Sequence, residues 1–192
     1  DEAVALARKM GWPVVLKVAS EAISHKSDVG GVLLNLEDEQ AVRAGFESIT
    51  QQAQQSQPEA DIEGVFVQKM ILSGQEVIIG AVQDPQFGAL VMFGSGGTEV
   101  EGLKDITFSL APLTEIEAER MLKRTWAGRK LEGYRNLPPA DRKAVLDALL
   151  RLGQLAVDFP QLSEVEINPL RVLPDGQGAV AVDVRINIGK LD

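Results

Sequence analysis

Cysteine is absent from this chain of 192 residues. Its absence excludes disulfide frameworks, thiolate zinc sites and cysteine nucleophiles. The sequence also has no apolar run approaching the roughly 20 residues that a membrane-spanning helix needs, and no signal peptide opens it. These absences predict a cytoplasmic protein with no membrane partner.

A basic excess is missing as well. The chain carries 19 Lys and Arg against 28 Asp and Glu, which gives a net charge of −9. The sequence therefore lacks the excess of cations that would neutralise a nucleic-acid backbone, and we expect no nucleic-acid partner. A small phosphate ligand remains compatible with this charge, because a nucleotide needs only a few placed donors.

Strands and helices come in unequal groups along the chain. The patterns predict helices at 2–10, 38–55, 114–125 and between Pro139 and Pro160, strands at 13–19, 31–36, 64–70, 75–82 and 89–94, and a closing hairpin at 163–186. This order favours α+β lobes over a regularly alternating wound sheet. The chain begins at Asp1 without a methionine, so we expect a domain cut from a larger protein.

Lys17 lies in the strand at 13–19, which is apolar on nearly every side. Lysine is seldom buried without a partner, because its charge loses hydration there, and a phosphate oxygen is a suitable partner. The alternative is a lysine at a strand end whose ammonium group reaches solvent. This segment alone does not decide between the two.

A glycine-rich segment, Gly94-Ser95-Gly96-Gly97, follows the apolar strand at 89–94. Glycines let a nest of backbone N–H groups surround phosphate oxygens. The segment matches neither the P-loop nor the dinucleotide-binding pattern, and a glycine-rich hairpin turn is an equal alternative.

The only histidine, His25, lies in a polar loop with Lys26, Ser27 and Asp28, ahead of Gly30-Gly31. Most lone histidines have no catalytic role. Here, however, Asp28 can orient the imidazole, and the glycines let backbone approach a ligand closely. A histidine so placed can accept a phosphoryl group as a nucleophile.

The closing hairpin brings polar residues opposite one another. If Asp175-Gly176 forms a two-residue turn, Asn168 faces Asp183 and Glu166 faces Arg185 on one polar face. An Asn–Asp pair offers hard oxygen ligands to Mg²⁺, which takes few ligands from the protein. The alternatives are an ordinary solvent-facing hairpin with a salt bridge, or a shifted register permitted by the glycines near the turn.

The strand expected at 64–70 ends with Gln68-Lys69-Met70, and Glu76 lies at the start of the next strand. Such an edge offers backbone groups to a purine and a carboxylate to ribose hydroxyls. Any hairpin would show the same pattern.

Taken together and in this order, the segments resemble one family, the ATP-grasp domain of the NDP-forming acyl-CoA synthetases, which is related to the β subunit of succinyl-CoA synthetase. The resemblance covers nearly the whole chain. It is carried by Val15-Leu16-Lys17-Val18, His25-Lys26-Ser27-Asp28-Val29-Gly30-Gly31-Val32, Val67-Gln68-Lys69-Met70, Gly74-Gln75-Glu76, Asp84-Pro85-Gln86-Phe87-Gly88, Phe93-Gly94-Ser95-Gly96-Gly97, Leu110-Ala111-Pro112-Leu113, Glu166-Ile167-Asn168-Pro169-Leu170 and Val182-Asp183.

The resemblance implies an ATP-grasp fold of two α+β lobes with mainly antiparallel sheets and the nucleotide between them. The lobes would span 1–66, truncated at its N-terminal side, and 67–192. It further implies binding of Mg²⁺ with ATP or ADP, while CoA would bind to a domain or subunit of the same parent outside this chain.

Roles follow for the positions that match the family's motifs. His25 would carry phosphate between a CoA-binding half and ADP, and Glu166 would stabilise the phosphohistidine. The implied nucleotide-binding residues are Lys17, Gln68, Lys69, Met70, Glu76, Gly94, Ser95, Gly96 and Gly97, and the implied Mg²⁺ ligands are Asn168 and Asp183.

A departure from the family and a second resemblance keep an alternative open. The family commonly has arginine where this chain has Ser109, which removes a charged phosphate contact. The segment Thr125-Trp126-Ala127-Gly128-Arg129-Lys130-Leu131 resembles Pat-type protein lysine acetyltransferases, which carry a regulatory, non-catalytic region of this kind ahead of an acetyltransferase domain. The chain is thus expected to be part of an enzyme, either an ADP-forming acyl-CoA synthetase or such an acetyltransferase.

Overall fold

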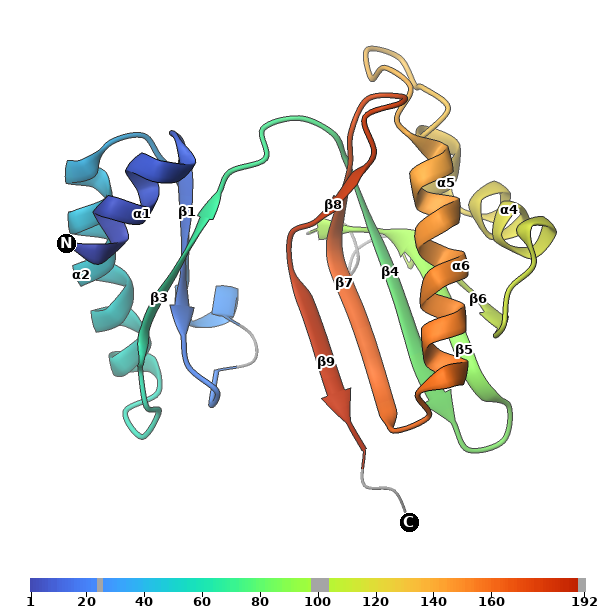
Figure 1. Cartoon of the computed structure of the whole chain (residues 1–192), viewed down its shortest axis with the longest axis horizontal. Helices are drawn as coiled ribbons and strands as arrows, with labels where there is room; N and C mark the ends of the chain where they lie inside the picture. Colours follow the sequence, from blue (N-terminus) through green and yellow to red (C-terminus); the bar gives the residue numbers. More distant parts are fainter. Residues whose placement is uncertain (24–25, 98–103, 190–192) are drawn as a thin grey trace. The chain divides into compact units, whose positions relative to one another are not determined.

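The computed structural model describes residues 1–23, 26–97 and 104–189. The chain forms two compact units, Asp1–Leu72 and Ser73–Asp192. Both units combine helices with a sheet whose strands all pair antiparallel (Figure 1). The α+β class with antiparallel sheets that the sequence predicted is therefore confirmed.

The first unit has a three-stranded sheet in the order β2-β1-β3. Its elements are α1 (Glu2–Met10), β1 (Val14–Ala19), a short 3-10 helix η1 (Lys26–Val29), β2 (Val32–Leu36), α2 (Glu39–Ser56) and β3 (Gly64–Lys69). The apolar residues of α1, α2 and β1 form one core, in which Val14, Leu16 and Val18 are fully buried. The side chain of Asp38 begins α2 by accepting a hydrogen bond from the N–H of Ala41.

The second unit has a sheet in the order β6-β5-β4-β7-β8, and β9 also pairs with β7. Its elements are β4 (Gln75–Asp84), β5 (Gly88–Ser95), β6 (Ile106–Leu110), α4 (Glu115–Arg124), α5 (Trp126–Lys130), α6 (Arg142–Asp158), β7 (Leu162–Val172), β8 (Ala179–Ala181) and β9 (Val184–Ile188). One core lies between the sheet and α4, α5 and α6. Thr114 and Glu117 start α4 with a capping box.

The strand β7 contains a bulge where it pairs with β4. Val77 pairs with Leu170, but Ile79 pairs with Ile167, so Asn168-Pro169 is one residue longer than the β4 segment it faces. The bulge shifts the alternation of inward and outward side chains. Before it, Val165 and Ile167 contribute to the core, whereas after it Leu170 and Val172 do so.

The division of the chain lies later than the expected lobe boundary between residues 66 and 67. The compact units separate after Leu72, because β3 pairs with β1 along its whole length, from Gly64 to Lys69. The sequence also did not predict β6, η1 or α5. These elements are short, and in β6 the large side chains Ile106, Phe108 and Leu110 are exposed, so no buried periodicity marks the strand.

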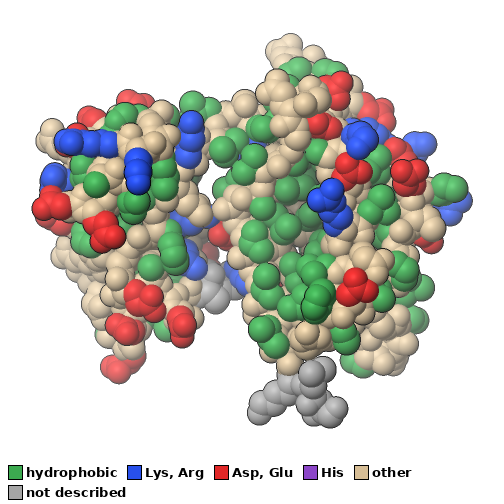
Figure 2. Space-filling model, viewed as in Figure 1, with side chains coloured by type: hydrophobic (Ala, Val, Ile, Leu, Met, Phe, Trp, Pro, Cys, Tyr) green, Lys and Arg blue, Asp and Glu red, His purple; other side chains and the backbone are tan. Residues whose placement is uncertain are grey.

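On the visible face of the second unit Lys and Arg lie among Asp and Glu, whereas the lower part of the first unit shows mainly Asp and Glu (Figure 2). Among the described residues, no helix combines the length and apolarity needed to cross a bilayer.

Candidate functional site

The glycine-rich segment Gly94–Gly97, called here the glycine loop, lies against β4. The N–H of Gly96 donates to the carbonyl of Glu76 at 3.4 Å, and a Cβ on Gly96 would come within 2.4 Å of the Val77 backbone. Gly97 has φ of +65°, and a Cβ there would lie 1.9 Å from Oε2 of Glu76. Glycine is required at Gly96, because a Cβ there would overlap the β4 backbone, and it is favoured at Gly97 by the positive φ.

Glu76, the residue expected near the ribose, is paired with an arginine that the sequence did not single out. It stands opposite Arg171 in the β4–β7 ladder, and Nη2 of Arg171 donates to Oε1 of Glu76 at 2.5 Å. Both side chains are partly buried, with 35% and 23% of their surface exposed. The second oxygen of the Glu76 carboxylate lies at Gly97, so this ion pair also forms part of the surface beneath the loop.

Asn168 contacts both the glycine loop and Asp183, the other expected metal ligand. Its side-chain Oδ1 accepts a hydrogen bond from the N–H of Gly97 at 2.9 Å. Its own N–H donates to the carbonyl of Asp183 at 3.0 Å. The structure therefore brings together Asn168, Asp183, Glu76 and the glycine loop, which the sequence placed far apart.

The register predicted for the closing hairpin is confirmed. The N–H of Gln177 donates to the carbonyl of Pro174 at 2.9 Å, so Asp175-Gly176 is a two-residue turn, and Glu166 pairs with Arg185. The expected continuous strand at 179–185 is instead interrupted at 182–183 between β8 and β9. The interruption lies opposite Pro169, which has no N–H to donate to a ladder.

The first unit holds the remaining expected nucleotide-binding residues. Lys17 lies in β1, opposite Val32 and Phe66, and only 9% of its surface is exposed. Gln68 and Lys69 end β3, and the N–H of Met70 donates to the carbonyl of Pro13 at 3.1 Å. His25 lies outside the described residues.

The first unit also has a pocket that none of these residues line. Its volume is about 450 Å³, and it lies between α1, α2 and β3, with Leu6, Val42 and Phe46 in its lining. Its lining residues are mainly apolar or acidic, which is a poor match for phosphate.

Asp105 is a residue of the site that sequence reasoning missed. Its carboxylate accepts hydrogen bonds from the hydroxyl of Ser95 and from the N–H groups of Trp126 and Ala127, at 2.7 to 2.8 Å. Burial by itself would raise the pKa of Asp105, but these hydrogen bonds outweigh it and hold the pKa below its ordinary value. Nothing in the local sequence signals contacts with partners so distant along the chain.

The surroundings of Ser109 contain arginines from another element. Ser109 pairs with Val91 at the sheet edge, and it lines a small pocket of about 130 Å³ with Arg120 and Arg124 of α4. Positive charge is therefore present beside the position where the family commonly has arginine.

The donor set suits Mg²⁺ rather than a softer metal. Within the described part of the chain, no three His, Cys, Asp or Glu side chains gather as they would around zinc. An amide oxygen of Asn168 and a carboxylate of Asp183 are hard oxygen ligands, and Mg²⁺ typically takes one or two protein ligands with phosphates and waters completing its shell. The amide oxygen of Asn168 has two lone pairs, so the bond from Gly97 leaves one for a cation.

Comparison with known proteins agrees with this arrangement. The family model described as an ATP-grasp domain matches residues 1–188. The chain is 46% identical to an ADP-forming acetate–CoA ligase of Archaeoglobus fulgidus over 190 residues, which are 99% of this chain and 27% of that protein. It is 41% identical to the β subunit of the ADP-forming acetate–CoA ligase I of Pyrococcus furiosus, covering 97% of this chain and 79% of that subunit.

Solved structures are similar over the same range. Acetyl-coenzyme A synthetase 1 of Ca. Korarchaeum cryptofilum, in complex with coenzyme A and Ca-AMPCP, matches with a TM-score of 0.92 and 44% identity over 97% of this chain and 81% of that chain. Another structure of that synthetase contains Mg-AMPPCP and a phosphohistidine segment pointing towards the nucleotide binding site.

The two antiparallel α+β units and the glycine loop beside an Asn–Asp pair define an ATP-grasp domain. The chain belongs to the ATP-grasp family, in the group formed by the ADP-forming acetyl-CoA synthetases. It spans about a quarter of the length of the single-chain ligase and about four fifths of the separate β subunit.

Proposed function

We propose that this chain is the nucleotide-binding domain of an ADP-forming acyl-CoA synthetase, and that it binds ADP or ATP with Mg²⁺. The observation that carries the proposal is the hydrogen bond from Gly97 to Asn168, because it puts the glycine loop beside oxygen ligands suited to Mg²⁺. The relatives' binding of nucleotide analogues and coenzyme A supports it.

Each part of the site has a chemical task in this proposal. The ammonium of Lys17 neutralises phosphate charge, and the absence of side chains at Gly96 and Gly97 lets the phosphates approach the backbone of the glycine loop closely. Asn168 and Asp183 would hold Mg²⁺, which screens the negative charge of the phosphates when it is bound. The carboxylate of Glu76 would accept hydrogen bonds from ribose hydroxyls, and Gln68, Lys69 and Met70 would line the adenine.

His25 would carry the phosphoryl group. An imidazole nitrogen of His25 attacks the terminal phosphorus of ATP, so that an N–P bond forms as the P–O bond to ADP breaks. The carboxylate of Glu166 would accept a hydrogen bond from the other imidazole nitrogen and so stabilise the phosphohistidine. CoA and the acyl substrate would be bound by a partner domain or subunit outside this chain, where the phosphoryl group is used to activate the acid.

Calorimetric titration tests the nucleotide site. ADP and ATP are titrated into the chain with and without Mg²⁺, and we expect binding that depends on the metal and is weakened by Asp183→Ala. Asp175→Ala is the matched control, since Asp175 lies in the exposed turn of the same hairpin. Binding whose affinity is unchanged both without Mg²⁺ and in Asp183→Ala would contradict the proposed site.

The histidine relay has a separate test. Incubation with Mg²⁺ and terminally labelled ATP should place an acid-labile, alkali-stable phosphate on the full-length protein, and His25→Ala should abolish it. A regulatory domain that only senses nucleotide is the alternative, and it predicts metal-dependent binding with no phosphohistidine and no ATP formation. The arginines beside Ser109 favour the catalytic function, because they supply charge near the position of the missing one.

A further inference from the structure

Asp105 connects the base of the glycine loop to the start of α5. Its Oδ2 accepts hydrogen bonds from Oγ of Ser95 and the N–H of Ala127, both at 2.8 Å, and its Oδ1 accepts one from the N–H of Trp126 at 2.7 Å. Its backbone carbonyl also accepts a hydrogen bond from the N–H of Ser95 at 3.0 Å. One residue therefore holds Ser95 by both its backbone and its side chain.

Ser95 is the residue from which the glycine loop departs. It is the last residue of β5 and is 1% exposed. The next two N–H groups reach separate parts of the candidate site: that of Gly96 donates to the Glu76 carbonyl, and that of Gly97 donates to Oδ1 of Asn168. A displacement of Ser95 would move both donors, because only one or two peptide units separate them from it.

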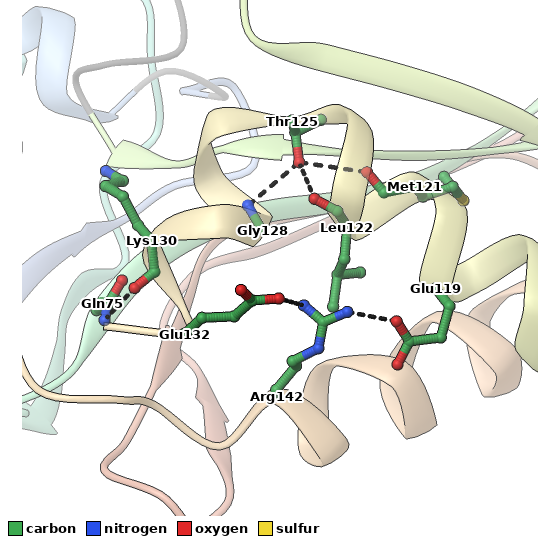
Figure 3. A network of polar contacts seen from close by, with 9 residues as sticks. All are labelled: Gln75, Glu119, Met121, Leu122, Thr125, Gly128, Lys130, Glu132 and Arg142. Carbon is green, nitrogen blue, oxygen red and sulfur yellow. Dashed lines mark hydrogen bonds and ion pairs between the residues drawn. The ribbon is translucent and has the colours of Figure 1, made fainter. Parts of the chain in front are cut away.

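The helix α5, whose first N–H groups donate to Asp105, is itself held in place. The hydroxyl of Thr125, which is 1% exposed, accepts a hydrogen bond from the N–H of Gly128 and lies within hydrogen-bond distance of the carbonyls of Met121 and Leu122 (Figure 3). At the far end of α5, the side-chain amide of Gln75 donates to the carbonyl of Lys130 at 3.1 Å (Figure 3). The short helix is thus held at both ends and provides a stable support for the Asp105 carboxylate.

We propose that Asp105 is a positioning residue that holds the glycine loop against Glu76 and Asn168, beside the nucleotide phosphates. This inference rests on the proposed nucleotide-binding function. It also gives the segment at Trp126 a role in the same site, since two of its backbone donors fix the carboxylate that in turn fixes Ser95. A neutral amide cannot replace this carboxylate, because an –NH₂ group in place of one oxygen faces a donor instead of accepting from it.

The test compares Asp105→Asn with Asp141→Asn. Asp141 is a matched control: it is 7% exposed, and its carboxylate also accepts backbone N–H groups, from Ala144 at the start of α6 and from Gly178. Neither partner belongs to the glycine loop. Two quantities are measured for each variant, the Kd for Mg–ADP and the hydrogen-exchange rates of the Ser95, Gly96 and Gly97 amides in the nucleotide-free chain.

We expect Asp105→Asn to raise the Kd for Mg–ADP by about tenfold and to speed exchange at the three loop amides. Asp141→Asn should lower the thermal midpoint while leaving both quantities unchanged. If Asp105→Asn fails to fold, Ser95→Ala takes its place, because it keeps the carboxylate, removes one of its donors and should weaken binding several-fold. In a double variant, Ser95→Ala should add little to Asp105→Asn, since both act through one contact.

The outcomes separate this inference from the function on which it rests. If the unaltered chain binds no Mg–ADP, the proposed function fails, while the exchange rates still decide whether Asp105 holds the loop. Unchanged affinity and exchange in Asp105→Asn would overturn the positioning role. So would equal losses of affinity in Asp105→Asn and Asp141→Asn, because both would then report only general destabilisation.

Discussion

The backbone N–H of Gly97 donates a hydrogen bond to the side-chain oxygen of Asn168, at 2.9 Å. This contact links a loop at the end of β5 with the bulge in β7 across the intervening strand β4. If Asn168 holds Mg²⁺ as proposed, the bound cation and the position of Gly97 would be thermodynamically coupled, and each should influence the other equally.

Gly97→Ala should disrupt the loop for two reasons. The residue has φ of +65°, which costs an alanine about 1–2 kcal/mol, and the new Cβ would collide with the Glu76 carboxylate. Gly176→Ala is the control, because φ is +77° there and nothing lies within 4 Å of the Cβ position. Urea unfolding should show a larger loss of unfolding free energy for Gly97→Ala than for Gly176→Ala. Only Gly97→Ala should lose affinity for Mg–ADP. Equal losses of stability would mean that the loop moves aside freely.

The Glu76–Arg171 ion pair should contribute measurably to stability. A double-mutant cycle with Glu76→Gln and Arg171→Met should give a coupling of about 0.5–1 kcal/mol, which falls as salt is raised. The exposed pair Lys143–Asp147, with 83% and 48% of its side chains exposed, should give a smaller coupling in the same urea titrations. A larger value for the exposed pair would show that the partial burial of Glu76 and Arg171 adds nothing.

Acid should remove the stabilisation that Asp105 provides. Because its folded-state pKa is lowered, this contribution is fully present above the unfolded pKa, which is near 3.8, and is lost as the pH falls through the still lower folded value. The difference in unfolding free energy between the unaltered chain and Asp105→Asn should therefore be largest at neutral pH and shrink below about pH 4. Unfolding titrations across this pH range measure the difference, with Asp175→Asn in the exposed turn as the control. A difference in unfolding free energy that stays constant with pH would contradict the prediction.

Lys17→Met should weaken the binding of ATP by about tenfold while leaving the fold intact. Methionine keeps the apolar stem that packs in the buried strand β1 but removes the charge proposed to contact phosphate. Adenosine, which has no phosphate, should bind the two proteins equally. The comparison variant Lys143→Met removes an exposed lysine, and titration calorimetry should find no change in its affinity for ATP.

Local patterns were sufficient to predict the larger elements and the hairpin register. Amphipathic periodicity marked α2 and α6, and the Asp175-Gly176 turn determined which residues of the hairpin face each other. The bulge at Asn168-Pro169 was not predictable, because it exists only relative to β4, a strand about 90 residues earlier. The contacts of Asp105 and Arg171 were missed for the same reason: each joins segments whose proximity is a result of the fold.

The bulge in β7 makes this strand sensitive to its length as well as to its composition. A substitution between Val165 and Pro169 changes one side chain, but insertion of one further residue there would move every following side chain to the opposite face. Leu170 and Val172 would leave the core, and Arg171 would enter it. An insertion in the exposed turn at Asp175-Gly176 would instead alter only the loop connecting β7 to β8. Insertions should therefore be far better tolerated in that turn than in the strand a few residues before it.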